Sequence, residues 1–349
     1  MIVRNESRVI LRSLASVKPK IDYWVIVDTG STDGTQEIIR EFMKDLPGEL
    51  HEKPWIDFEH NRNEALALAL NKADYLLFLD ADEEWVISND FDKNELHRDF
   101  YAVRNRDLNV DLHRIGLINA RLPWYWEGVL HEEIRSPLEV KGEVLEGVIN
   151  YGLPRDGHRA QDPIRYKKDA EVLEKALLKD PDNARYVFFL AQSYGAAGDL
   201  ASSLKYYEKR AEMGGFPPDV FWSLFTIGCI REDLHMDDKL ILDAYCKAYA
   251  LDSTRAEPLH HLAGFYQKKG FPLLAYILAK TALELPPPCS LAYVLREVHD
   301  YSLLLKFACA AHSLKKFDEA KEAYQQLLKV PNLPPDALTV VQHNLRLLS

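Results

Sequence analysis

The chain has 349 residues, 47% of them hydrophobic and 28% charged, and its length predicts two domains. A formal net charge of −11 argues against a nonspecific nucleic-acid or anionic-membrane surface, although a small site for a metal-bridged phosphate ligand is compatible with it. No apolar run approaches the roughly 18 residues of a transmembrane segment, and the four cysteines form no Cys-x-x-Cys pair, so we expect a cytoplasmic protein with reduced thiols.

Up to about residue 150 the sequence alternates short apolar runs with helical patterns. Residues 23–28 predict a buried strand, and residues 35–46 follow with apolar side chains on one helical face. Residues 61–73 predict a second helix and residues 74–81 a second buried strand. Strand, helix, helix and strand in this order predict a largely parallel sheet with helices on its faces. Such sheets bind ligands at the carboxyl ends of their strands, so the acids at those ends are candidate ligand contacts.

After about residue 160, helical patterns follow one another without strand signals. Residues 190–213 and 262–285 align without gaps and share Leu-Ala, Tyr and Gly at the same offsets, and residues 227–251 and 308–330 are weaker copies. These copies resemble tetratricopeptide repeats, which are helical hairpins about 34 residues long. The sequence therefore predicts a stack of helical hairpins, in which the shared positions pack the core.

A dense group of acids follows the second predicted strand, in the stretch Leu79–Trp85. Asp80 and Asp82 form an Asp-x-Asp motif, and carboxylates one residue apart at a strand end can reach one hard divalent cation. A cation would offset the unfavourable clustering of negative charge at a partly buried position, and it would also hold the oxygens of a diphosphate. The alternative is a solvated acidic loop, which the motif by itself does not exclude.

Four segments resemble, in the same order, the motifs of family 2 glycosyltransferases with the GT-A fold. They are residues 2–7 (IVRNES), 27–35 (VDTGSTDGT), 57–66 (DFEHNRNEAL) and 79–85 (LDADEEW). A fifth segment, residues 124–134 (WYWEGVLHEEI), is similar to a His-Glu segment common in members with tetratricopeptide repeats behind the catalytic domain. The S-glycosyltransferases that modify small bacterial peptides share this two-part plan.

The resemblance implies an α/β GT-A nucleotide-sugar-binding domain over residues 1–160, followed by an all-α tetratricopeptide-repeat solenoid over residues 161–349. It implies a metal-dependent enzyme of the hexosyltransferase type, which moves a sugar with inversion from a UDP-linked nucleotide-sugar to an acceptor and uses Mn²⁺ or Mg²⁺ as cofactor. The concave face of a solenoid suits a polypeptide acceptor. A glycan or lipid acceptor, and self-association of the repeats into a homo-oligomer, stay open.

The resemblance also assigns roles to residues at the matching positions. Glu6 and Asp28 would contact the uridine or ribose of the donor, and Arg62 would lie near the nucleobase or the diphosphate. Asp80 would contact the ribose or a metal-bound water, and Asp82 would ligate the cation directly. A threonine follows Asp28 where the family usually has a second aspartate, so the nucleobase is left open.

An inverting transferase needs a general base that takes the acceptor's proton during its attack on the anomeric carbon. Glu132 is the first candidate because it lies in the His-Glu match, and Glu127 is the second. Glu133 and Asp156 are the remaining candidates. His131 would supply a further metal ligand, since neutral imidazole suits Mn²⁺, and the alternative for this residue is a structural role.

Other residues near these segments have two interpretations each. Trp124, Tyr125 and Trp126 would either stack on sugar rings or pack in the core. Asn150 stands where related sequences often have histidine, and His158 is a substitute for it as a metal ligand.

Two other functions compete with an active transferase. A phosphatase or phosphotransferase of the haloacid dehalogenase type would need its Asp-x-Asp near the first strand, with Thr or Val two residues after the second Asp, where this chain has Glu84. A nonenzymatic repeat scaffold would tolerate loss of the site residues, yet Asp28, Arg62, Asp80 and Asp82 are all present. The sequence therefore favours a transferase, and it specifies neither the sugar nor the acceptor.

Overall fold

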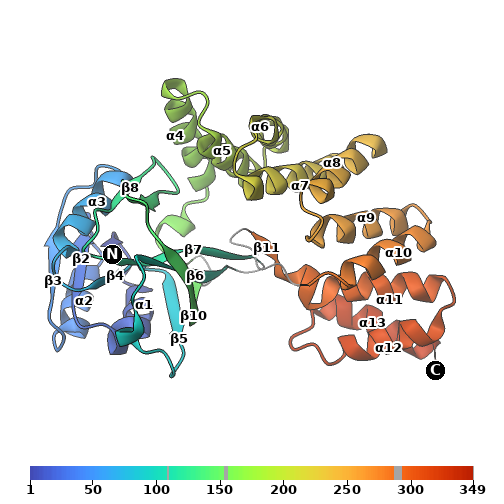
Figure 1. Cartoon of the computed structure of the whole chain (residues 1–349), viewed down its shortest axis with the longest axis horizontal. Helices are drawn as coiled ribbons and strands as arrows, with labels where there is room; N and C mark the ends of the chain where they lie inside the picture. Colours follow the sequence, from blue (N-terminus) through green and yellow to red (C-terminus); the bar gives the residue numbers. More distant parts are fainter. Residues whose placement is uncertain (108–109, 153–155, 287–292, 349) are drawn as a thin grey trace. The chain divides into compact units, whose positions relative to one another are not determined.

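The computed structural model describes residues 1–107, 110–152, 156–286 and 293–348. They form two compact units, Met1–Gly198 and Asp199–Ser349 (Figure 1). The strands β1 to β10 and the helices α1 to α5 belong to the first unit, and the helices from α6 onward belong to the second. No helix in these described ranges is long and apolar enough to cross a membrane.

A three-stranded parallel sheet forms the N-terminal part of the first unit. β2 (Trp24–Asp28) lies in its middle, between β1 (Ile2–Val3) and β3 (Gly48–Glu52). The helices α1 (Ile10–Val17) and α2 (Thr35–Met43) each have one apolar face, as the helical period requires. The buried side chains of these helices and of the middle strand form one core: Ile10, Leu14, Ile26, Ile39 and Met43. This core fixes the carboxyl end of β2.

The second sheet of the first unit is mixed. Its strands are β4 (Tyr75–Leu77), β5 (Glu83–Ile87), β6 (Phe100–Asp107), β7 (Val110–Asn119) and β10 (Gly142–Gly152). β7, β6, β10 and β5 are neighbours in that order, and β4 pairs antiparallel with β7. The prediction of a largely parallel sheet is therefore right for β1 to β3 and wrong for β4, because the long strand β7 supplies the hydrogen-bonding edge for β4.

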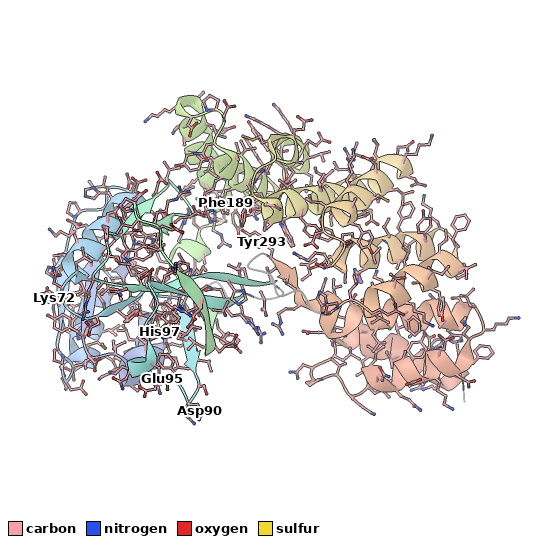
Figure 2. All side chains as sticks on the ribbon, in the orientation of Figure 1. Lys72, Asp90, Glu95, His97, Phe189 and Tyr293 are labelled. Carbon is pink, nitrogen blue, oxygen red and sulfur yellow. The ribbon has the colours of Figure 1, made fainter. Side chains whose placement is uncertain are left out.

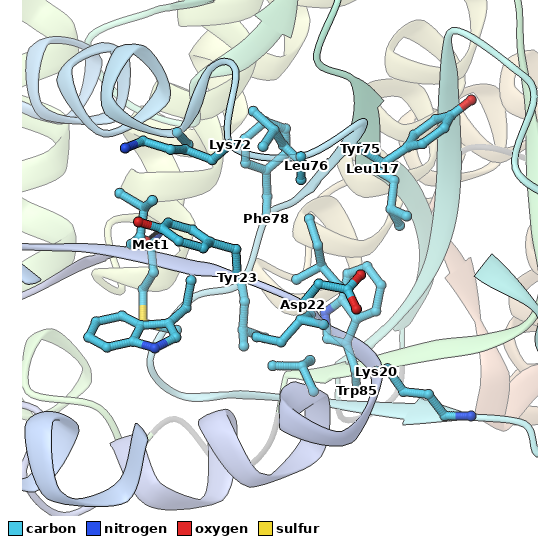
Figure 3. A pocket seen from close by; sticks show the side chains of 18 of the residues that line it. Met1, Lys20, Asp22, Tyr23, Lys72, Tyr75, Leu76, Phe78, Trp85 and Leu117 are labelled. Carbon is cyan, nitrogen blue, oxygen red and sulfur yellow. Dashed lines mark hydrogen bonds between the residues drawn. The ribbon is translucent and has the colours of Figure 1, made fainter. Parts of the chain in front are cut away.

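An apolar cavity of about 310 Å³ lies between β2 and β4 (Figure 3). It is lined by residues 23–26 and 75–79, together with core side chains such as Trp85 and Leu117. Arg62 also lines it, whereas the carboxylates predicted for the site are not among the lining residues. The cavity is thus a gap in the packing between the two sheets, beside the predicted site.

A small antiparallel pair of strands, β8 (Tyr125–Glu127) and β9 (Glu133–Arg135), lies in the chain between β7 and β10 of the mixed sheet. β8 lies against helix α3 (Phe58–Ala69). Asn63 of this helix exchanges two hydrogen bonds of 2.8 Å with the backbone of Trp126, one as donor and one as acceptor. β8, from which the loop to β9 begins, is therefore anchored to the helix that carries Arg62.

Helical hairpins follow the strands, as the sequence predicts. The helices of the first unit after its strands are α4 (Arg165–Lys179) and α5 (Ala184–Ala196). The α-helices described in the second unit are α6 (Leu200–Met213), α7 (Pro217–Asp233), α8 (Asp238–Leu251), α9 (Glu257–Lys268), α10 (Pro272–Leu283), α11 (Leu303–Ser313), α12 (Phe317–Leu327) and α13 (Pro335–Leu347). Ala263, Ala279 and Ala308 are fully buried among these helices, and their small side chains allow close packing.

The predicted fold class, an α/β domain followed by an all-α repeat region, is confirmed. Residue 160 lies near the change from strands to helices, whereas the compact units divide after Gly198. α4 and α5 thus pack with the strands of the N-terminal unit. The domain limit at residue 160 stays a prediction.

Candidate active site

Asp28 ends β2 and is fully buried. Its Oδ1 accepts hydrogen bonds from the backbone N–H groups of Gly30 at 2.9 Å and Ser31 at 2.8 Å, and from Gln36 Nε2 at 3.1 Å. Gly30 has φ of +106°, a conformation that favours glycine and lets the chain turn around the carboxylate. Oδ2 is buried and has no hydrogen-bond partner among the described residues. A carboxylate oxygen without a partner can accept a hydrogen bond from a ligand, such as one from a ribose hydroxyl or a nucleobase N–H.

Glu6 lies within the electrostatic reach of the Asp-x-Asp motif. Its carboxylate accepts a hydrogen bond of 3.0 Å from the backbone N–H of His158. Burial raises the pKa of Glu6 to about 7, and the charges of Asp82, Asp33 and Asp156 add to the increase in pKa. The structure therefore gathers several carboxylates around Glu6, and this excess of negative charge is what a cation would offset.

Arg62 links two of the predicted site residues. Its Nη2 lies 3.0 Å from Asp80 Oδ1, and its Nε lies 3.1 Å from Glu132 Oε2. The guanidinium also lies over the ring of Trp126, 5.0 Å from its centroid. Although burial disfavours the charged form of Asp80, Arg62 and Arg114 lower its pKa below the usual range. Burial raises the pKa of Glu132, and the Arg62 charge opposes this increase.

Asp82 is the acid of the motif that has no ion-pair partner among the described residues. Burial raises its pKa, and the Asp80 and Asp156 charges raise it further. Gly157 packs directly against it, since a Cβ at that position would lie 2.7 Å from Asp82 Oδ2. The Asp82 carboxylate is therefore free for an external ligand, whereas Asp80 is held by two arginines.

The predicted metal ligands do not form a closed site. Within the described ranges, no group of three or more His, Cys, Asp or Glu side chains is placed to hold a metal ion. The ring of His131 stacks on that of Phe189, with 3.9 Å between centroids and 10° between planes. Desolvation, followed by the Arg185 and Arg159 charges, lowers the pKa of His131, so the imidazole is neutral at pH 7. Metal ligation by His131 stays a prediction, and Asp82 fits a cation that takes its other oxygens from a diphosphate.

The remaining base candidates form ion pairs away from the Arg62 guanidinium. Glu127 lies 3.1 Å from Arg135 and is half exposed. Glu133 lies 2.9 Å from the same arginine, and Asp156 forms a bidentate pair with Arg12 at 2.9 and 3.0 Å. Of the four candidates, Glu132 is thus the one that joins the cluster around Arg62.

Arg114 and Glu83 belong to this cluster. The sequence motif places Glu83 beside the predicted sugar pocket, whereas the sequence assigns no role to Arg114. Arg114 on β7 forms an ion pair with Glu83, and its Nη1 lies 3.8 Å from Asp80 Oδ2. Glu83 Oε2 accepts a hydrogen bond of 3.0 Å from the Asp80 backbone N–H. Asn150 donates to Asn105 Oδ1 at 2.7 Å, so it contributes to a buried polar network instead of a metal site. The register of β7 that brings Arg114 here carries no signal in a single sequence.

The three aromatic residues of the fifth segment lie in different environments. Trp124 is 7% exposed, packs edge-to-face on Phe100 and donates its indole N–H to the Asn119 carbonyl at 2.9 Å. The geometry therefore supports core packing for Trp124. Tyr125 is 40% exposed, and Trp126 supports the Arg62 guanidinium.

Comparison with known proteins agrees with this geometry. Residues 1–88 match the model of the family described as glycosyl transferase family 2. This N-terminal part is a family 2 glycosyltransferase domain. The matched residues include the turn at Asp28, the Arg62 helix and both acids of the motif, and the match ends just after β5. The predicted enzyme class and two-part plan are confirmed by this match together with the helical hairpins that follow.

Curated relatives cover different shares of this chain. A TPR repeat-containing protein of Synechococcus elongatus is 27% identical over 312 residues, which are 82% of this chain and 75% of that protein. The glycosyltransferase SunS of Bacillus subtilis is 24% identical over 226 residues, or 60% of this chain and 51% of SunS. An uncharacterized glycosyltransferase of Rickettsia felis is 36% identical over 84 residues, or 24% of this chain and 28% of that protein. The chain thus spans about half of SunS.

Solved structures similar to part of the chain include a thermophilic TPR protein of Thermus thermophilus. It has 16% identity and a TM-score of 0.38, and the match covers 52% of this chain and 91% of that one. MamA is similar at 15% identity with a TM-score of 0.39, over 52% of this chain and 92% of MamA.

Proposed function

We propose that this glycosyltransferase moves a sugar with inversion from a UDP-linked donor to a polypeptide side chain, in the cytoplasm and with a divalent cation. The observation that carries the proposal is the gathering of Glu6, Asp80, Asp82 and Glu132 from three separate segments of the first unit. Arg62 joins Asp80 to Glu132, and Glu6 lies within the electrostatic reach of Asp82. Asp28 offers its orphaned Oδ2 to the nucleoside. The described cysteines are free thiols, in keeping with a reducing compartment.

The carboxylates fit a divalent cation that bridges to the donor. Asp82 would ligate Mn²⁺ or Mg²⁺ directly, and Asp80, whose oxygens face Arg62 and Arg114, would contact a metal-bound water or the ribose. When bound, the cation neutralises charge on the leaving diphosphate as a Lewis acid. Glu6, with its pKa near 7, adds charge to this group of carboxylates and contacts the donor.

Glu132 is the base in this proposal. Its carboxylate accepts the proton of the acceptor while the acceptor attacks the anomeric carbon. Burial raises the pKa of Glu132 above the ordinary glutamate value, and the higher pKa makes the carboxylate a stronger base near neutral pH. Arg62 holds the ionised form at 3.1 Å. Once Glu132 is protonated, Arg62 retains its pairing with Asp80 at 3.0 Å, so no buried cation is left unpaired.

Titration with UDP, with and without Mn²⁺, tests the donor site, and a hydrolysis screen across nucleotide-sugars tests the reaction. We expect UDP to bind only with the metal. Asp82→Asn should lower turnover by about 10²-fold, the loss of several kcal/mol of charge stabilisation, while leaving the fold intact. Asp90→Asn, an exposed acid of the same region, is the matched control (Figure 2). Absence of UDP binding with metal present would favour a repeat scaffold.

The acceptor is tested separately. We infer that the repeats bind a polypeptide because stacked helical hairpins offer an extended surface with many side chains. Transfer of a radiolabelled sugar to peptide, glycan and lipid acceptors, in parallel reactions with the full chain, distinguishes the three classes. Labelling of a glycan or lipid without any labelling of peptide would refute the polypeptide assignment and leave the donor assignment intact.

A further inference from the structure

The loop between β8 and β9 carries Glu132 and has an unfavourable backbone conformation. Gly128 has φ of +124° and His131 has φ of +55°, both in the left-handed region. Glycine adopts this region at no steric cost, whereas histidine does so only where its surroundings impose it. Contacts from outside the loop must therefore hold the backbone that leads to Glu132.

One set of these contacts comes from α3. The Gly128 N–H donates a hydrogen bond of 2.8 Å to Glu59 Oε2, at the start of the loop. At its end, Glu132 pairs with Arg62 of the same helix. α3 thus holds both ends of the loop, and the middle of the loop is held elsewhere.

The second set of contacts comes from α5, the second helix after the strands. The Val129 N–H donates to the Tyr186 hydroxyl at 3.3 Å. Arg185 Nη2 donates to the His131 carbonyl at 2.7 Å, and its guanidinium also forms an ion pair with Glu133. Two neighbouring residues of α5 therefore fix the backbone before and after the left-handed position.

Phe189 lies one turn further along α5 (Figure 2). It holds the His131 side chain at the left-handed position. Phe189 is 7% exposed, and its ring stacks on the His131 imidazole with 10° between the planes. The Arg185 guanidinium lies 4.8 Å from the centroid of the same phenylalanine ring. Two planar groups thus pack on one ring, which fixes where the histidine next to Glu132 lies.

We propose that Arg185, Tyr186 and Phe189 are positioning residues, which hold the Glu132 carboxylate where it meets the acceptor. This inference rests on the proposed function. General-base catalysis depends on placement to within a fraction of an ångström, so a carboxylate on a strained loop needs support from a rigid element. A helix that the sequence assigns to the repeat region is then part of the catalytic apparatus.

Full-length Phe189→Leu, Phe189→Tyr and Leu190→Ala variants test the inference. The first removes the stacking ring and the second retains it. Leu190→Ala removes a fully buried side chain of the same helix and should lower stability. None of the loop contacts described above involves Leu190, so this variant is the control for lost stability. The readouts are turnover, the Kd for UDP with Mn²⁺, and amide hydrogen exchange of residues 128–133, which needs no activity.

Phe189→Leu should speed amide exchange in the loop and lower kcat by about tenfold or more. The Kd for UDP should stay within twofold of the parent, because the ring contacts described for Phe189 are with His131, Phe188 and Arg185, none of which is a donor-binding carboxylate. Phe189→Tyr should restore both values, and Leu190→Ala should lower the melting temperature while kcat is retained below it. Unchanged loop exchange, or faster exchange with unchanged kcat, would overturn the positioning role alone. A parent chain without turnover on any donor would overturn the proposed function, and this inference with it.

Discussion

Arg62→Met should strongly destabilise the first unit because it leaves two carboxylates without their shared counter-charge. The Glu132 side chain is 8% exposed and that of Asp80 31% exposed. Removing one partner of a buried ion pair destabilises by about 3–5 kcal/mol. Asp80 keeps Arg114 at 3.8 Å and has some solvent contact, so we expect the lower end, about 3 kcal/mol.

Arg135→Met is the matched control because this arginine also bridges two glutamates, Glu127 and Glu133. Its side chain is 51% exposed and those of its partners 52% and 37%, so the loss should be about 0–1 kcal/mol. Urea denaturation at pH 8, followed by tryptophan fluorescence, measures both losses. The signal reports mainly the first unit, since Trp222 is the sole tryptophan of the sequence beyond residue 198.

The pH dependence gives a second test of the same reasoning. Without Arg62, burial raises the pKa of Glu132 further, so the folded variant binds a proton that the unfolded chain has lost. The free energy of unfolding of the variant then falls as pH rises above the unfolded pKa. The gap between parent and Arg62→Met should be smaller at pH 5 than at pH 8. Equal losses for Arg62→Met and Arg135→Met at pH 8 would refute the buried-pair argument.

Three further variants test individual site residues. Glu132→Gln should lower turnover by about 10²-fold at an unchanged Kd for UDP, and an equal loss in donor binding would assign the carboxylate to the donor instead. Glu6→Gln should raise the melting temperature at pH 8 but not at pH 4. The folded pKa of Glu6, about 7, lies above the ordinary glutamate pKa of 4.5, so its ionisation costs the parent stability as pH rises through this window. Gly157→Ala should weaken Mn²⁺-dependent UDP binding, because its Cβ would lie 2.7 Å from Asp82 Oδ2, and unchanged titration curves would contradict that contact.

The sequence by itself determined the features that depend on neighbouring residues. Apolar periodicity located β2 and the helical hairpins, because the side chains that form one face of a helix or strand recur at a fixed spacing. The turn at Asp28 and the pair Asp80 and Asp82 were identified from contiguous motifs. Asp28 does end β2, and Asp80 and Asp82 lie in the short turn segment between β4 and β5, since a strand followed by a turn is a local structure.

Only the tertiary structure decided which distant residues meet. Arg62 and Glu132 are 70 positions apart, and no spacing rule predicts that one arginine lies between this glutamate and Asp80. Arg114 reaches the same cluster through the register of β7, and β4 pairs with β7 instead of extending the parallel sheet. His131 stacks on Phe189 of a helix that the repeat pattern assigns to another domain. These contacts depend on how whole elements pack, and packing is set by the summed burial of many side chains, whose effect no short segment contains.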